Sequence, residues 1–88
     1  MDIGELEQQV AAAFPAAQIE VADTTGGGDH FAVLVVSDRF EGLPLLRRHR
    51  LVYDALGDLM RADIHALSLR TLTPTEHEDT LITKIGRS

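Results

Sequence analysis

The sequence predicts a small α+β domain in which helices pack on one face of a three-stranded sheet. Three observations support this fold class. The chain has 88 residues, of which 44% are apolar, enough for one domain with a modest core. Apolar residues recur with the helical period in some segments and alternate in others, which distinguishes helices from strands. Glycine and proline separate these segments, and the resulting order is α-β-β-α-α-β.

The first predicted helix begins after Asp2, which has the N-cap position of a capping box with Glu5 at N3. Pro15 ends this helix near Phe14, because proline cannot continue the helical hydrogen bonds. One stripe of the helix is apolar, as expected of a face that packs on a sheet, and consists of Ile3, Leu6, Val10, Ala13 and Phe14.

Two strands with a glycine-rich connection follow. Residues 18–23 alternate between apolar and polar side chains, which predicts a half-buried strand. Residues 30–37 are apolar on both faces and rich in valine, so this strand is predicted to be central in its sheet. The connection, residues 24–29, contains three consecutive glycines and predicts a flexible turn that closes a hairpin.

Two helices are predicted next. Pro44 suits the first turn of a helix that begins at Leu45 and ends before Gly57, a typical residue after a helix C-terminus. Asp58 can then cap a short helix that ends at residue 61 or 62.

The third predicted strand covers residues 64–72, whose side chains alternate, and Pro74 ends it. No helix or strand is predicted after it. We therefore divide the chain into a domain of residues 1–76 and a polar C-terminal tail of residues 77–88.

Composition narrows the classes of function. The chain has no cysteine, which excludes disulfides, thiolate metal sites and cysteine nucleophiles. Its first residues lack the features of a signal peptide, and its longest apolar run is far too short to span a membrane. No nucleophile motif or paired carboxylates of catalytic type occur. We expect a cytoplasmic protein that is not an enzyme and does not contact a membrane.

Charge is unevenly distributed. The net charge is −6, which disfavours non-specific binding of nucleic acid. Arg47, Arg48 and Arg50 nevertheless lie together in the second predicted helix. They are candidates for contacts with phosphate or with an acidic partner, and the alternative is that two of them form the solvated face of an amphipathic helix.

Four sequence blocks resemble the BolA family. They are VVSDRFEG at 35–42, LLRRHRLVY at 45–53, IHALSL at 64–69 and TLTPTE at 71–76. The blocks agree with the family in order and spacing, and the resemblance covers about residues 3–76. His77 stands where the family usually has tryptophan.

The resemblance implies a fold of the same α-β-β-α-α-β order, with the KH-like (class II) topology related to nucleic-acid binders, and makes residues 1–76 a BolA-like domain. It also implies two functions. Many BolA-like proteins pair with a monothiol glutaredoxin and share a bridging [2Fe–2S] cluster, in iron–sulfur cluster trafficking or iron regulation. Others are described as DNA-binding proteins that regulate transcription.

The resemblance also indicates candidate cluster ligands. The family's C-terminal cluster histidine corresponds to His65, although spacing alone favours a strand-end histidine bonded to the backbone. His30 matches the family's loop ligand, with Asp29 as a competing candidate. A cluster held by this chain alone would need cysteine, so a partner would have to supply the thiolates. The resemblance implies that these are the partner's cysteine and glutathione. Of the other histidines, His49 is predicted to be half-buried and hydrogen-bonded, and His77 to have no role.

We therefore expect a non-catalytic adaptor that pairs with a monothiol glutaredoxin and shares a [2Fe–2S] cluster through His65 and His30, with a homodimer as a possible state without the cluster. The alternative is a small DNA-binding transcriptional regulator that uses the KH-like surface and Arg47, Arg48 and Arg50. The Gly-x-x-Gly loop that clamps nucleotides in KH domains does not occur in the sequence, which weakens this alternative.

Overall fold

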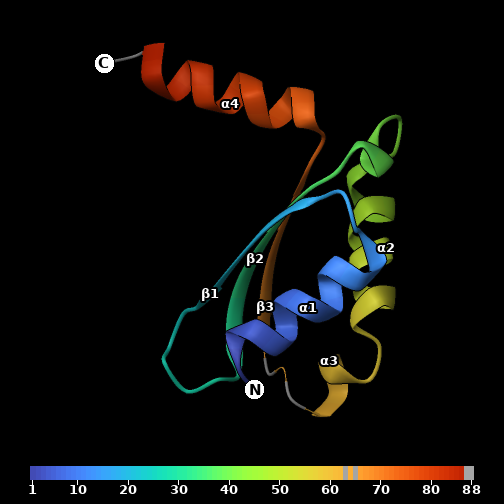
Figure 1. Ribbon diagram of the computed structural model, residues 1–88, viewed down its shortest axis with the longest axis vertical. Coiled ribbons are helices and arrows are strands. Elements are labelled where there is room, and N and C mark those ends of the chain that lie inside the picture. The colour runs from blue at the N-terminus through green and yellow to red at the C-terminus, as the bar shows by residue number, and fades with distance from the viewer. Residues whose placement is uncertain (63, 65, 87–88) are drawn as a thin grey trace.

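The computed structural model describes residues 1–62, 64 and 66–86. They form the predicted α+β fold, with a one-turn 3-10 helix (η1) and a C-terminal helix (α4) in addition (Figure 1). No helix in these ranges is long and apolar enough to cross a membrane. In chain order the elements are α1 (Ile3–Ala13), β1 (Gln18–Asp23), β2 (His30–Val36), η1 (Asp38–Phe40), α2 (Leu45–Leu56), α3 (Leu59–Ala62), β3 (Ala66–Leu72) and α4 (Pro74–Gly86).

The sheet has the order β1-β2-β3, with β2 in the centre as predicted. Strands β1 and β2 are antiparallel, and their register pairs Gln18 with Val36 and Asp23 with Phe31. Strands β2 and β3 are parallel, with His30 opposite Ala66. The parallel pairing follows from the connection, because the chain crosses through α2 and α3 and returns to the end of the sheet where β2 began.

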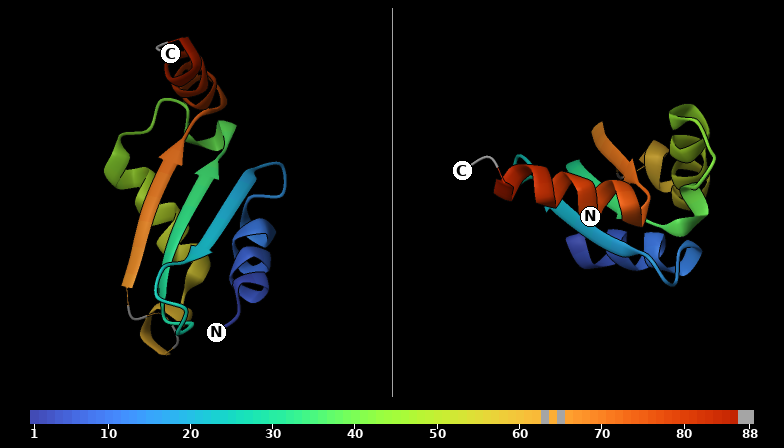
Figure 2. Two further views of the ribbon diagram at one scale, coloured as in Figure 1. Left: turned by 90° about the vertical axis from the view of Figure 1, so that its left-hand side faces the viewer. Right: turned by 90° about the horizontal axis from the view of Figure 1, so that it is seen from above.

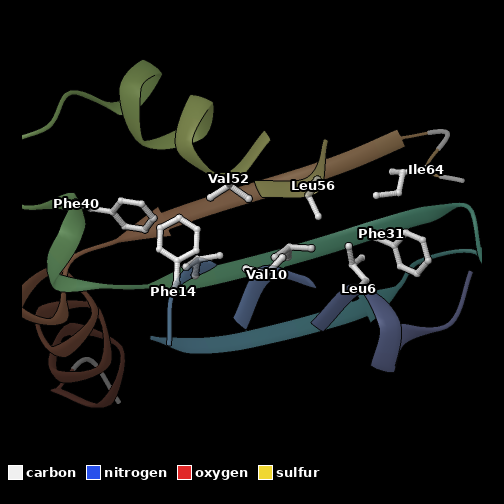
Figure 3. Close-up of a cluster of buried hydrophobic side chains, with 10 residues drawn as sticks. Leu6, Val10, Phe14, Phe31, Phe40, Val52, Leu56 and Ile64 are labelled. Carbon is white, nitrogen blue, oxygen red and sulfur yellow. The ribbon is translucent and has the colours of Figure 1, made fainter. Parts of the chain in front are cut away.

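Helices α1 and α2 lie on one face of the sheet, and the left view of Figure 2 looks at the opposite face. The side chains of β2 alternate between these faces. Phe31, Val33 and Val35 are buried under the helices, whereas Ala32 and Leu34 are half-buried on the other side. The segments outside the sheet add their own apolar side chains to this core (Figure 3), namely Leu6, Val10, Phe14, Phe40, Val52, Leu56 and Ile64.

The segment after β2, predicted only to break the strand, contributes to the core. The Arg39 N–H donates to the Ser37 hydroxyl at 3.1 Å, so that Ser37 caps η1 and β2 ends at Val36. This turn places Phe40 in the core at 0% exposure, with its ring centroid 5.5 Å from that of Phe14.

Strand β3 begins at Ala66 and not at residue 64 as predicted. The N–H of Ile64 donates to the carbonyl oxygen of Leu59 at 2.9 Å, so it completes the turn after α3 instead of joining the sheet. The Ile64 side chain is nonetheless buried in the core.

Helix α4 occupies a segment for which the sequence analysis predicts no element. The missed signal is a capping box of Thr73 and Glu76, in which the Thr73 N–H donates to Glu76 Oε1 at 2.8 Å and the Glu76 N–H donates to Thr73 Oγ1 at 3.2 Å. Pro74 fills the first helical position, where no N–H is needed. The predicted boundary between residues 76 and 77 therefore falls inside α4.

Two leucines of α2 test the assignment of the core. Leu56 is 1% exposed and Leu46 is 71% exposed. We expect Leu56→Ala to lower the free energy of unfolding by about 2–5 kcal/mol, because it leaves a cavity in a packed interior. Leu46→Ala should change it by less than about 0.5 kcal/mol. Urea denaturation followed by circular dichroism measures both, and equal effects of the two substitutions would contradict the core described above.

Candidate functional site

The connection between β1 and β2 is a hydrogen-bonded turn built on Asp23. Its Oδ1 accepts the N–H groups of Thr25 and Gly26 at 3.2 and 2.8 Å, and its Oδ2 accepts the N–H of Gly28 at 2.9 Å. Gly26 and Gly28 have φ angles of 81° and 76°, which residues with a Cβ rarely adopt. The glycines thus allow a defined conformation, where the sequence predicts only a flexible turn.

This turn brings Asp29 and His30 to the start of β2. Nδ1 of His30 lies 2.9 Å from Oδ1 of Asp29, and the two side chains are 37% and 47% exposed, respectively. The backbone of His30 is anchored as well, since its carbonyl oxygen accepts the Thr24 N–H at 2.9 Å and the Thr24 hydroxyl at 3.1 Å. An ionised Asp29 favours the His30 tautomer with hydrogen on Nδ1, because a carboxylate can only accept. In that tautomer, Nε2 is the ring nitrogen that can act as a ligand.

The start of β3 lies beside this pair. The Ala66 N–H donates to the carbonyl oxygen of Asp29 at 3.2 Å, and Ala66 is opposite His30 in the register. His65, the first predicted cluster ligand, lies outside the described residues. In the sequence it directly precedes Ala66.

The chemistry of the His30–Asp29 pair suits a metal ligand. Histidines that bind a metal through one ring nitrogen usually donate the other N–H to a carboxylate or a carbonyl. Imidazole nitrogens replace thiolates on one iron of Rieske-type [2Fe–2S] clusters, so His30 fits this group. Within residues 1–62, 64 and 66–86, no three histidine or carboxylate side chains form a group that could hold a metal ion. His30, with Asp29 beside it, is the candidate ligand in this part of the chain.

Arg48, a candidate for contacts with nucleic acid or a partner, makes its contacts within this chain. Its guanidinium donates to both carboxylate oxygens of Glu76, at 2.6 and 3.3 Å. It also donates to the carbonyl oxygens of Leu43 and Thr71, at 2.8 and 3.4 Å. The side chain is 12% exposed. Arg48 therefore joins α2 to the end of β3 and the start of α4, and so connects two of the family-like blocks.

Arg47 and Arg50 differ from Arg48 because both are exposed. In the described part of the chain, neither has a carboxylate within 4.0 Å. Arg50 lines two shallow surface grooves of about 340 and 320 Å³, the first shared with Arg47 and the second with Tyr53. These two arginines form the accessible basic surface of α2.

Three further residues, Arg39, His49 and His77, have separate surroundings. Arg39 donates to the carbonyl oxygen of Ala13 at 2.6 Å and lies 4.9 Å above the ring of Phe14. His49 is half-buried, as predicted, but no described residue forms a hydrogen bond with its buried Nε2, where a hydrogen bond is predicted. His77 is part of α4.

These features define a class: a small α+β domain with a mixed three-stranded sheet, whose hairpin loop places a histidine–carboxylate pair beside the start of the last strand. A family model described as "BolA-like protein" matches residues 9–76. The chain belongs to the BolA family.

Individual relatives agree with this assignment. The DNA-binding transcriptional regulator BolA of Escherichia coli (strain K12) is 39% identical over 80 residues, which cover 83% of this chain and 76% of that protein. The crystal structure of a bol-like protein from Babesia bovis has a TM-score of 0.81 at 33% identity and covers 92% of this chain and 94% of its own. The BolA domain of SufE1 from Arabidopsis thaliana has a TM-score of 0.76 at 34% identity, with 84% and 93% covered. The predicted family and fold class are thereby confirmed.

Arg48 also controls the protonation of Glu76. Its hydrogen bond to the carboxylate, followed by that of the Thr73 N–H, lowers the pKa of Glu76 from 4.5 to about 2. The Glu76 side chain is 44% exposed, so water and salt screen the ion pair.

The low pKa of Glu76 predicts a pH-dependent contribution to stability. Because this pKa is lower in the folded protein than in the unfolded chain, the contribution is present above about pH 5 and is lost as the pH falls toward about 2. We expect the urea midpoint of the wild type to exceed that of Glu76→Gln at pH 7, and the gap to narrow as the pH is lowered below 5. Glu78→Gln, on the same helix, is the control that removes a carboxylate but keeps the Arg48–Glu76 pair. A constant gap for Glu76→Gln would contradict the role given to the Arg48–Glu76 pair.

Proposed function

We propose that this protein is a non-catalytic adaptor that pairs with a monothiol glutaredoxin and shares a bridging [2Fe–2S] cluster with it, in iron–sulfur cluster trafficking or iron regulation. The observation that carries the proposal is the His30–Asp29 pair at the start of β2, next to the start of β3. Membership of the BolA family supports it, because that family includes such adaptors according to the resemblance described above. A reducing cytoplasm suits a partner that depends on glutathione.

The chain's own residues would bind and orient one side of the cluster. His65 is the proposed first ligand, and His30 the second, through Nε2, while Asp29 keeps the proton on Nδ1. Asp29 is the alternative second ligand. Since the chain contains no cysteine, the partner's cysteine and glutathione would supply the thiolates. The bound cluster would supply an iron–sulfur unit for transfer or sensing, and no catalytic step is proposed for this chain.

Visible absorption and circular dichroism test this proposal when the protein is titrated into a cluster-loaded monothiol glutaredoxin. We expect a new spectrum that saturates near equal stoichiometry. His65→Ala should abolish it, and His30→Ala should weaken or shift it, because each removes a nitrogen ligand. His77→Ala is the matched control and should leave the spectrum unchanged.

Two outcomes would alter this proposal. If His30→Ala keeps the wild-type spectrum and Asp29→Ala loses it, the carboxylate is the second ligand. If the wild-type protein leaves the glutaredoxin spectrum unchanged at all ratios, the shared-cluster function is wrong.

A second candidate is the regulation of transcription through DNA binding. The E. coli relative, 39% identical, is named as a DNA-binding transcriptional regulator. In this chain the accessible basic residues of α2 are Arg47 and Arg50, while Arg48 is held by Glu76. The structure of α2 therefore limits this alternative to a smaller basic surface than three arginines would provide.

Salt dependence tests the DNA-binding candidate. The logarithm of the DNA association constant should decrease linearly with the logarithm of the salt concentration. If Arg47 and Arg50 each neutralise one phosphate, this negative slope should become shallower by about 1.8 in the Arg47→Ala/Arg50→Ala variant. Arg70→Ala, which removes an exposed arginine from the sheet, is the control and should keep the wild-type slope. Equal slopes for the double variant and the wild type would reject a DNA contact through α2.

A further inference from the structure

The face of the sheet opposite α1 and α2 forms an ordered surface, which the left view of Figure 2 shows face-on. The strand registers define its rows. Glu20, Leu34 and Arg70 form one row across the three strands, with the apolar residue in the centre and opposite charges at the edges. The next row consists only of small residues, namely Ala22, Ala32 and Ser68. We call these six residues the open sheet face.

A shallow groove follows these two rows. Its volume is about 270 Å³, and the six residues of the open sheet face line it together with Val21 and Val33. Ala32 and Leu34 are half-buried, and Ser68 and Arg70 are exposed. The short side chains of the second row allow another molecule to come close to the backbone of the sheet.

The open sheet face extends along β2 to His30, the candidate cluster ligand. Side chains two residues apart in a strand share a face, so His30, Ala32 and Leu34 lie in one line along β2. The distance along the strand from residue 34 to residue 30 is about 13 Å. A molecule that contributes further ligands beside His30 must lie over this end of the sheet. At the other end of β2, α4 projects on the same side as the open face (Figures 1 and 2).

We infer that the open sheet face is the docking surface for the thiol-bearing partner of the proposed function, on which this inference rests. The partner presents an apolar patch to Ala32 and Leu34, an acidic group opposite Arg70 and a basic group opposite Glu20. Because this face runs along β2 to His30, a partner that covers Ala32 and Leu34 would also bring its thiolates close to that histidine. This continuity is the reason for inferring the thiol-bearing partner as the occupant.

Among the described side chains, α2 also carries exposed apolar residues. Leu45 is 60% exposed and Leu46 is 71% exposed. This end of α2 is tied by Arg48 to Thr71 and Glu76, near the last residues of β3. His30 lies opposite Ala66, the first residue of β3, and the two ends of β3 are about 20 Å apart along the strand. A partner seated on Leu46 is therefore far from the candidate ligand.

Matched substitutions on the two surfaces test the docking site. Leu34→Asp and Leu46→Asp introduce the same charge on the open sheet face and on α2, and Arg70→Glu and Arg50→Glu form a second pair at exposed positions. Titration of each variant with cluster-loaded monothiol glutaredoxin gives the dissociation constant, and urea denaturation confirms that each variant folds. We expect Leu34→Asp and Arg70→Glu each to weaken binding by about tenfold or more. Leu34→Asp would bury an unpaired charge in the interface, and Arg70→Glu would oppose the partner's acidic group. The two α2 variants should bind within about twofold of the wild type.

The outcomes separate this inference from the proposed function. Weaker binding of the α2 variants, with wild-type binding of Leu34→Asp and Arg70→Glu, overturns the docking site while the shared cluster remains. A wild-type protein that produces no new spectrum overturns both. Sedimentation of the protein alone tests whether a second copy of this chain occupies the open sheet face. A dimer that Leu34→Asp converts to a monomer would assign the face to that second copy and overturn the inference.

Discussion

Strand β2 is hydrogen-bonded on both edges, to antiparallel β1 and to parallel β3, and the other parts of the structure depend on this double pairing. Because side chains alternate along a strand, one set of its residues enters the core and the other faces away from the helices. A shift of either register by one residue would turn the side chains of the shifted strand to the opposite face and expose its core residues. The same register places His30 opposite Ala66, so the core and the candidate site are determined by one alignment.

The two ends of the sheet carry different kinds of polar side-chain pair. At the end where β2 and β3 begin, His30 and Asp29 are partly exposed and held by an ordered turn, which suits binding. At the opposite end, Arg48 is largely buried, has four acceptor atoms and connects three elements, which suits structural support. Arg48 and Glu76, which lie in blocks that resemble the BolA family, maintain the architecture. The His30–Asp29 pair lies outside those blocks, at the end of the sheet for which we propose binding.

This division bears on the choice between an adaptor and a DNA-binding regulator. An acidic chain with two accessible arginines on α2 has little positive charge with which to neutralise phosphates. A chain without cysteine can take part in an iron–sulfur cluster only if another molecule supplies thiolates, which makes the partner part of the site. The uncovered sheet face beside His30 is the kind of surface that such an arrangement requires. The physical properties of the chain thus favour the adaptor.

The fold class, the order α-β-β-α-α-β and the central position of β2 could be predicted from the sequence, because hydrophobic periodicity and turn residues act locally. The family was predicted from the resemblance of four sequence blocks. The resemblance to the BolA family also indicated His30 as a candidate ligand, and this role stays a prediction. Tertiary structure decided what depends on contacts between distant segments. Arg48 and Glu76 are 28 residues apart, so only the folded chain shows that they pair and that Arg48 is not available to a ligand. In the same way, Phe40 belongs to the core because η1 brings its ring against Phe14, which no local pattern reveals. The rows of the open sheet face exist only through the registers of three strands, and strand register is set by the burial of the whole sheet.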